Sequence, residues 1–166
     1  MISFIEAFKK ELETESVQTR RMLQIVPDDK LGWQPHPKSM TIKALATHLA
    51  EIPLMIVMAL DHDKWDFADS PYAPVDMNSA AELVTRFDEC LKMARQSLEK
   101  ATDDILQKRW IMCAGAQVYA DLEKWEAVRH AFGQNAHHRA QLGVFLRLLN
   151  LPIPGPYGPS ADEMGG

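Results

Sequence analysis

Residues His130-Ala-Phe-Gly-Gln134-Asn-Ala-His137-His138-Arg139-Ala-Gln141 lie inside a helical pattern that we expect to run from about 122 to 150. Residues four apart stack on one face of a helix, so His130, Gln134 and His138 form one stripe. His130 and His138 are about 12 Å apart along the helix axis and cannot bind one ion together. The usable pairs are Gln134 with His138, or His130 with Gln134, and a third ligand must come from another element. A lone histidine on a helix is more often a surface or hydrogen-bonded core residue, so the stripe alone does not establish a metal site.

The composition is that of an ordinary globular chain with a moderate negative charge. The 166 residues are 46% hydrophobic and 25% charged, and their formal net charge is -5. This length is enough for one domain with a hydrophobic core. No run of Lys and Arg occurs, so we expect no direct binding to nucleic acid. No apolar run reaches about 18 residues, so we expect no membrane span.

The two cysteines, Cys90 and Cys113, form neither a C-x-x-C motif nor a disulfide framework. This usage indicates a reducing compartment, and we therefore expect a cytoplasmic protein. Each thiol is expected to be a small buried hydrophobic group rather than a nucleophile. The sequence also contains no nucleophile elbow, no glycine-rich phosphate loop and no Ser/His/Asp spacing that would indicate another kind of catalytic site.

Four segments have the apolar spacing that is typical of amphipathic helices. We expect helices over residues 3–25, 41–60, 79–100 and 122–150. The expected N-caps are Ser3, Ser39 or Thr41, Ser79 and Asp121. Pro53 should kink the second helix, because its ring removes a hydrogen bond and clashes with the preceding turn. Four such helices, joined by loops of unequal length, predict an all-α four-helix bundle. We expect a single domain over residues 1–166, including a proline-rich tail over 151–166.

The connecting segments are expected to be irregular, with some aromatic side chains packed onto the bundle. Trp33 should bury its ring beneath the loop that contains Pro35 and Pro37. Part of the loop 61–78, which carries Trp65, Phe67 and Tyr72, should pack down as well. Residues 109–120 are ambiguous, because Gly115 and the β-prone pair Val118-Tyr119 favour irregular or extended chain.

The missing third ligand is expected on the second helix. Side chains on facing helices build the cofactor sites of helix bundles. The second helix carries His48 near its middle, and the fourth helix carries Gln134 and His138. Glu51, three residues after His48, lies on nearly the same face and could serve as a neighbouring carboxylate that orients a ligand.

Four stretches of the sequence carry a family resemblance. They are Trp33-Gln-Pro-His-Pro-Lys-Ser-Met, Ala46-Thr-His48-Leu-Ala-Glu51, Asn135-Ala-His137-His138-Arg139-Ala-Gln141-Leu and Tyr157-Gly-Pro-Ser-Ala-Asp-Glu. Together they resemble the DinB family, named for DNA-damage-inducible proteins, over nearly the whole chain. The resemblance implies an up-and-down bundle, usually a homodimer, in which three histidines hold a divalent metal. It also implies kinship with transferases and isomerases that use bacillithiol or mycothiol.

The resemblance assigns metal ligands residue by residue. His48 matches the ligand from the second helix, and His138 matches the second ligand from the fourth helix. The first ligand of the fourth helix falls on Gln134, where the family pattern has histidine. An amide oxygen is a weaker ligand than imidazole for zinc or nickel, which puts full metal occupancy in question. The candidates for supporting positions beside the ligands are Glu51, His130 and His137, and His137 could instead face the dimer partner.

Two classes of function follow from these residues. In the first, the chain is a metal-dependent enzyme, a transferase of the thiol-dependent type or a hydrolase. His48, Gln134 and His138 would then leave a coordination position open for water or a thiolate, whose pKa the zinc or nickel ion lowers. In the second, the chain is a non-catalytic, stress-related bundle with a degenerate metal site that acts in binding. The expected partners are a second copy of the chain and a small-molecule substrate or low-molecular-weight thiol.

Overall fold

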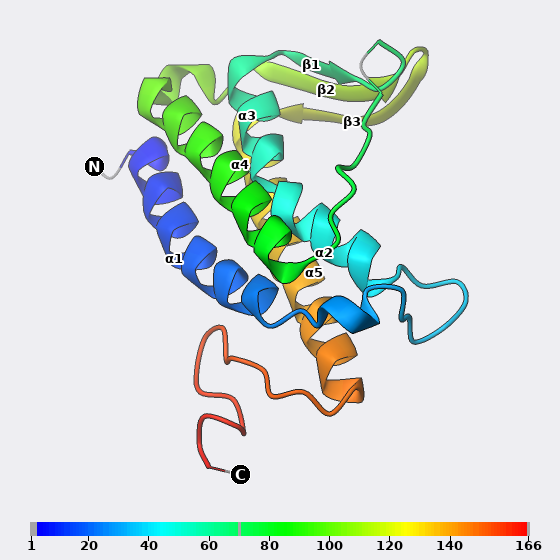
Figure 1. Cartoon of the computed structure of the whole chain (residues 1–166). Helices are drawn as coiled ribbons and strands as arrows, with labels where there is room; N and C mark the ends of the chain where they lie inside the picture. The colour runs from blue at the N-terminus through cyan, green and yellow to red at the C-terminus, as the bar shows by residue number, and fades with distance from the viewer. Residues whose placement is uncertain (1–2, 70, 166) are drawn as a thin grey trace.

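The computed structural model describes residues 3–69 and 71–165. The ends of the expected 1–166 domain and residue 70 of the expected 61–78 loop lie outside this range. Figure 1 shows the expected four-helix bundle, in which a second helical arm is divided into two consecutive helices. The helices are α1 (Phe4–Gln24), α2 (Ile42–Glu51), α3 (Pro53–Asp61), α4 (Ala80–Lys100) and α5 (Lys124–Leu148).

The helix boundaries follow from caps that the sequence indicates. Side chains of Ser3, Thr41 and Ser79 each accept a hydrogen bond from a backbone N–H in the first turn of α1, α2 and α4, as expected. Pro53 is the first residue of α3 and separates it from α2, which confirms the predicted interruption. The prediction that Asp121 caps the last helix was wrong. Glu123 takes that role in a reciprocal pair with Glu126.

The apolar faces of the helices meet in one core. Its most deeply buried side chains come from every helix and include Leu23, Leu45, Ile56, Phe87, Val128 and Leu142. The ring of Trp33 packs edge-on against Phe145 of α5, with centroids 5.7 Å apart, so the loop aromatic is placed as expected. The apolar residues that recur at helical spacing in the sequence are therefore the ones that pack together in the core of the bundle.

A small three-stranded sheet covers one end of the bundle, so the expectation of an all-α chain was incomplete. The strands are β1 (Lys64–Asp66), β2 (Arg109–Ala114) and β3 (Gln117–Glu123), in the order β1-β2-β3. β1 is parallel to β2, and β2 is antiparallel to β3. Gly115 adopts a positive φ of 57° in the tight turn between β2 and β3, a conformation that favours glycine. The extended alternative for residues 109–120 is confirmed.

α3 and α4 run in the same direction along the bundle, while the other successive arms alternate in direction (Figure 1). The chain achieves this by returning from the sheet along the side of the bundle through residues 71–79, which we call the strap. The Lys43 ammonium near the start of α2 donates to Asn78 Oδ1 at 2.8 Å and pairs with Asp76. The strap therefore lies against α2 and delivers the chain to the start of α4.

The proline-rich tail is folded back onto the bundle by charged contacts. Asp162 pairs with Arg147 of α5, and Glu163 pairs with Arg21 of α1 at 2.5 Å. Their carboxylates also accept backbone N–H groups of Ile153 and Gly155. The tail is thus part of the packed structure, although it contains no regular element.

The segment Ile42–Asp61, which spans α2 and α3, is long and apolar enough to cross a membrane, with a mean hydropathy of 1.5. In this structure 67% of an 18-residue window of that segment is buried inside the bundle. Its apolar character is accounted for by its position in the core, between α4 and α5.

Candidate functional site

His48 of α2 and His138 of α5 meet inside the bundle. Their ring centroids are 4.6 Å apart, and the rings are nearly perpendicular at 83°. Gln134, one turn before His138 on α5, lies beside the pair and contacts His138 directly. The structure therefore brings together all three residues that the sequence singled out as ligands.

Two glutamine side chains hold the His138 ring. Its Nε2 lies 2.9 Å from Gln134 Oε1, and its Nδ1 lies 2.8 Å from Gln141 Oε1. A neutral imidazole has one donor and one acceptor, so one of the two amides must turn its NH2 group toward the ring. The ring orientation is fixed from both sides, in the way that neighbouring groups orient metal-binding histidines.

Both histidines are held in the neutral form at neutral pH. Burial lowers the pKa of His48, and the neighbouring His138 lowers it further, while Glu51 opposes the shift. Burial also lowers the pKa of His138, against an opposing contribution from the Gln141 hydrogen bond. Neutral imidazole is the form that binds metal ions and accepts protons.

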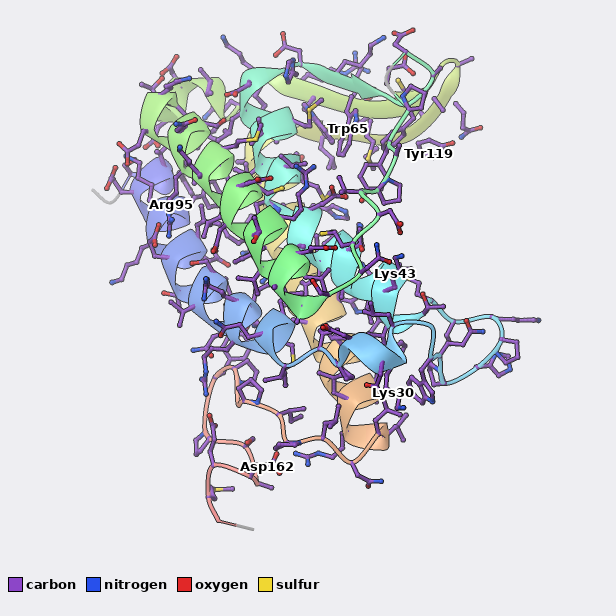
Figure 2. All side chains as sticks on the ribbon, viewed as in Figure 1. Lys30, Lys43, Trp65, Arg95, Tyr119 and Asp162 are labelled. Atoms are coloured by element: carbon purple, nitrogen blue, oxygen red, sulfur yellow. The ribbon has the colours of Figure 1, made fainter. Side chains whose placement is uncertain are left out.

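A cavity of about 320 Å³ opens beside His48 and Gln134 and extends beneath the sheet. We call it the sheet pocket. Its other walls come from α2, α3, the strands and the strap, and they are mostly apolar. Figure 2 shows Trp65 and Tyr119 on the side of the sheet that faces the helices and the strap. The expectation that Trp65, Phe67 and Tyr72 pack down is confirmed, because all three line this pocket.

Glu51 lies at the base of the sheet pocket in a network that the sequence did not reveal. Its buried carboxylate accepts the Arg86 guanidinium of α4 at 2.9 Å and the Tyr72 hydroxyl of the strap at 2.5 Å. Burial and the bond to Glu51 raise the pKa of Tyr72, which stays protonated. Glu51 is thus engaged by α4 and the strap while it lies close enough to influence His48.

The buried thiol of Cys90 lies near the Glu51 network. Burial raises its pKa to about 11, so the thiol is protonated at neutral pH and a poor nucleophile. Cys113 is also buried and free. Both cysteines therefore occupy the structural role that we expected.

The two other histidines of the motif take different places. His130 is exposed and lines the sheet pocket at its rim. His137 is exposed on α5, with its ring centroid 4.8 Å from that of His138. His130 could therefore contact a molecule in the pocket, and His137 lies beside the inner pair on its solvent side.

Arg139 and Asn135 of the same motif have a structural role. The Arg139 guanidinium is buried and pairs with Glu15 of α1 at 2.7 Å. It also donates to the Tyr157 hydroxyl of the tail at 2.8 Å. Asn135 accepts the Thr19 hydroxyl at 2.9 Å. α5 thus lines the pocket with Gln134 and joins α1 and the tail through Asn135 and Arg139.

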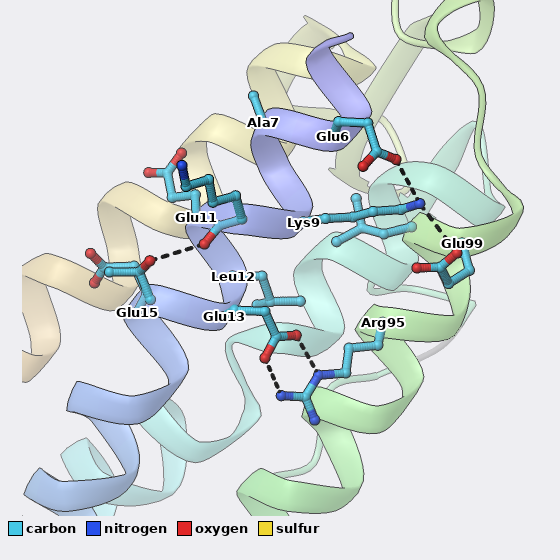
Figure 3. A pocket seen from close by; sticks show the side chains of 12 residues that line it. Glu6, Ala7, Lys9, Glu11, Leu12, Glu13, Glu15, Arg95 and Glu99 are labelled. Carbon is cyan, nitrogen blue, oxygen red and sulfur yellow. Dashed lines mark hydrogen bonds and ion pairs between the residues drawn. The ribbon is translucent and has the colours of Figure 1, made fainter. Parts of the chain in front are cut away.

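A second hollow, of about 1010 Å³, lies between α1 and α4, and Figure 3 shows its walls. Several of its charged side chains are paired with one another. Lys9 pairs with Glu6 at 2.9 Å and with Glu99 at 3.2 Å, and Arg95 pairs with Glu13 at 2.6 Å. It is a broad, solvated groove remote from the histidines, so we assign the candidate site to the smaller sheet pocket.

Within residues 3–69 and 71–165, no cluster of three His, Cys, Asp or Glu side chains is arranged to hold a metal ion. The reason is visible in the geometry, since the third residue beside His48 and His138 is Gln134. A site here would combine two imidazole nitrogens with one amide oxygen.

These features define a helix-bundle protein whose facing histidines, from α2 and α5, adjoin an apolar pocket. Residues 11–142 match the family model of the DinB superfamily. This match covers most of the chain, which therefore belongs to the DinB superfamily, in agreement with the resemblance read from the sequence.

The chain is similar over its whole length to uncharacterized protein YrdA of Bacillus subtilis. The two are 27% identical over 164 residues, which cover 98% of this chain and 93% of YrdA. A crystal structure of a DinB-like protein from Bacillus cereus matches with a TM-score of 0.69 and 20% identity, covering 90% of this chain and 95% of that one. A mycothiol-dependent maleylpyruvate isomerase matches with a TM-score of 0.62 and 14% identity, covering 86% and 64% of the respective chains. At these identities the two structures establish a shared fold.

Proposed function

We propose that this chain binds a divalent metal ion, zinc or nickel, between α2 and α5. His48, His138 and Gln134 are the proposed ligands. The observation that supports this most directly is the 4.6 Å separation of the two imidazole rings. Two imidazoles on one zinc-like ion, each bound at about 2.0–2.1 Å, have ring centres roughly 5 Å apart. The observed pair needs little movement to meet that requirement.

The donor set fits a weak site rather than a tight one. All three donors are neutral, and Gln134 must turn its oxygen from His138 toward the ion. Glu51, the nearest carboxylate, is already engaged by Arg86 and Tyr72. The Gln141 contact would hold the far nitrogen of His138 while Nε2 binds the ion.

The proposed activity is that of a metal-dependent transferase of the thiol-using type. A bound ion would lower the pKa of a coordinated thiol or water and so supply the nucleophile. The structural likeness to a mycothiol-dependent isomerase is the reason to propose a low-molecular-weight thiol as partner. The apolar walls of the sheet pocket would exclude water, and His130 at its rim could accept a proton from an incoming group.

A second candidate is a non-catalytic, stress-related binding protein with a degenerate site. The observation that favours it is the complete engagement of His138, whose two nitrogens contact Gln134 and Gln141. In this alternative the glutamines replace the metal, and the sheet pocket still receives a small molecule.

Calorimetric titration separates these candidates. Protein purified without a His tag and stripped with a chelator is titrated with Zn²⁺ and Ni²⁺. Saturable uptake of one ion per chain that His48→Ala abolishes, and that the exposed control His62→Ala retains, would support the metal site. Negligible heat in the wild type would favour the binding protein. If metal is taken up, thiolate absorbance after addition of glutathione tests whether the ion activates a thiol.

Two further expectations about the protein as a whole stay proposals. A homodimer is supported by apolar side chains on the outer face of α5, where Val144 and Leu148 are each 58% exposed. Sedimentation at micromolar concentration tests it. A cytoplasmic location is supported by the two free, buried cysteines.

A further inference from the structure

The sheet pocket has walls that a metal site alone does not require. Beyond His48 and Gln134, the cavity is lined by side chains of α3, the strap and the sheet. Besides the aliphatic side chains of Ile52 and Leu54, these walls are aromatic rings and thioethers, namely Met55, Trp65, Phe67, Tyr72, Met112 and Tyr119. Flat rings and polarizable sulfur atoms pack favourably against other aromatic surfaces.

The sheet directs its side chains into the pocket by means of a β-bulge. Trp65 and Met112 are partners across β1 and β2, so their side chains lie on the same side of the sheet. Between β2 and β3, Met112 pairs with Ala120 and Cys113 pairs with Val118, which leaves Tyr119 as an extra residue. Regular alternation would place Tyr119 on the side opposite Ala120 and Met112. The bulge re-aims it, and Tyr119 lines the same pocket as Met112.

The aromatic wall is continuous. The rings of Trp65 and Phe67 have centroids 4.9 Å apart, and those of Phe67 and Tyr119 are 6.3 Å apart. Tyr72 of the strap also lines the pocket and donates its hydroxyl to Glu51. A small ring system inserted between these walls would touch aromatic or thioether groups on several sides.

The charges around the pocket do not favour a ligand whose body carries a positive charge. The one carboxylate among the lining residues, Glu51, is neutralised by Arg86 and hydrogen-bonded by Tyr72. An aromatic wall can attract a quaternary ammonium group through cation–π contacts. Here the Arg86 guanidinium already neutralises Glu51, and no free carboxylate lines the described walls to balance a second cation. A charged body would lose its hydration without compensation.

We propose that the sheet pocket binds an uncharged molecule with a flat, aromatic or conjugated body, whose polar end faces His48 and Gln134. The volume of about 320 Å³ fits a small ring system. This proposal names the class of ligand that binds at the proposed functional site. It rests on the proposed function only for the reaction that the bound ligand would undergo. Binding itself requires the apolar walls, which exist without the metal.

The test uses N-phenyl-1-naphthylamine, an uncharged dye whose emission rises in apolar surroundings. Titration into the metal-free protein should show saturable binding that uncharged 2-naphthol displaces and phenyltrimethylammonium does not. Met112→Lys places a charge in the wall and should weaken dye binding at least about tenfold. The matched control is Met93→Lys on α4, where the methionine is 44% exposed and outside the pocket, and it should bind as the wild type does.

A second variant guards against misfolding. Tyr119 is 57% exposed, so Tyr119→Ala should keep the far-UV circular dichroism of the fold while it weakens dye binding several-fold, because the wall loses one ring. Absence of saturable binding in the wild type would overturn the proposal. So would equal affinities in the Met112→Lys and Met93→Lys variants, or displacement by phenyltrimethylammonium in preference to 2-naphthol.

The two proposals fail separately. His138→Ala removes a proposed metal ligand that does not line the sheet pocket, so it should abolish metal uptake while dye binding is retained. A wild type that takes up dye and no metal would contradict the proposed metal site alone. A wild type that takes up metal and no dye would contradict the ligand class alone.

Discussion

Gln134 contacts a ring nitrogen of His138, with Gln134 Oε1 and His138 Nε2 2.9 Å apart, and the His138 ring also lies against the ring of His48. This contact satisfies the nitrogen that we propose as a metal ligand. The family resemblance read from the sequence implies a histidine at position 134, and two imidazoles one helical turn apart can chelate an ion together. In the proposed site, the glutamine would replace this chelate with a hydrogen-bonded pair that an ion must open.

Gln134→His is expected to tighten zinc or nickel binding by about tenfold or more, which is roughly 1.4 kcal/mol. Neutral imidazole is a better ligand than an amide oxygen for these ions. Calorimetric titration of the metal-free wild type and the variant measures the difference. His48→Ala should abolish binding in both backgrounds. Equal, negligible affinity in wild type and Gln134→His would remove the site, together with the enzymatic proposal that depends on it.

The lowered pKa values of His48 and His138 predict loss of stability in acid. The unfolded chain binds protons at these histidines below about pH 6.5, whereas the folded protein resists protonation to a lower pH. The unfolded state then holds more protons, so the free energy of unfolding falls as the pH drops from about 6.5 toward the folded pKa values. The stabilising contribution is fully present above that window.

The pH dependence is measured as the midpoint of thermal unfolding in buffers between neutral pH and mild acid. Replacement of both site histidines, in the double variant His48→Gln with His138→Gln, should flatten the curve in this window. The exposed control His62→Gln should keep the wild-type slope. A double variant with an unchanged slope would assign the acid sensitivity to other groups.

The bundle and its inner histidines could be predicted from the sequence because they depend on local periodicity. Apolar residues at helical spacing specify which faces are buried, and His48, Gln134 and His138 lie at fixed positions on those helices. The sheet was harder to predict. β1 has only three residues, and its partner β2 follows about forty residues later, so its pairing depends on the completed bundle.

The walls of the sheet pocket could not be predicted either, because they too are formed by segments that lie far apart in the sequence. Glu51 was singled out, but its partners Arg86 and Tyr72 come from α4 and from the strap. No spacing rule connects three such segments. The bulge at Tyr119 also depends on the register of β2 against β3, which a single strand does not reveal. A usable signal was present in the aromatic residues of the 61–78 segment, which indicated that this loop packs down.

Arg139→Met is expected to destabilise the fold by about 3–5 kcal/mol, because it leaves the carboxylate of Glu15 without its buried partner. The variant also loses the hydrogen bond to Tyr157 that holds the tail. Urea denaturation measures the change. The control Arg95→Met removes an exposed pair with Glu13 and should cost less than about 1 kcal/mol. Similar losses of unfolding free energy in both variants would show that the buried contacts of Arg139 stabilise the fold no more than an exposed ion pair does.

Tyr72→Phe is expected to loosen the strap. The variant keeps the ring in the sheet pocket but removes the 2.5 Å hydrogen bond to Glu51, which leaves the buried carboxylate with Arg86 alone. Loss of a hydrogen bond to a buried charged group costs about 1.5–3 kcal/mol. Part of that loss should occur as local opening, because the strap contains no helix or strand to hold it. Backbone amides of residues 71–79 should then exchange with deuterium faster than in the wild type, while the amides of α4 keep their protection.

The matched control is Tyr119→Phe, whose hydroxyl makes no hydrogen bond to the rest of the described chain, and it should leave strap exchange unchanged. Equal exchange rates in the two variants would mean that Lys43, through Asp76 and Asn78, holds the strap without help from Glu51.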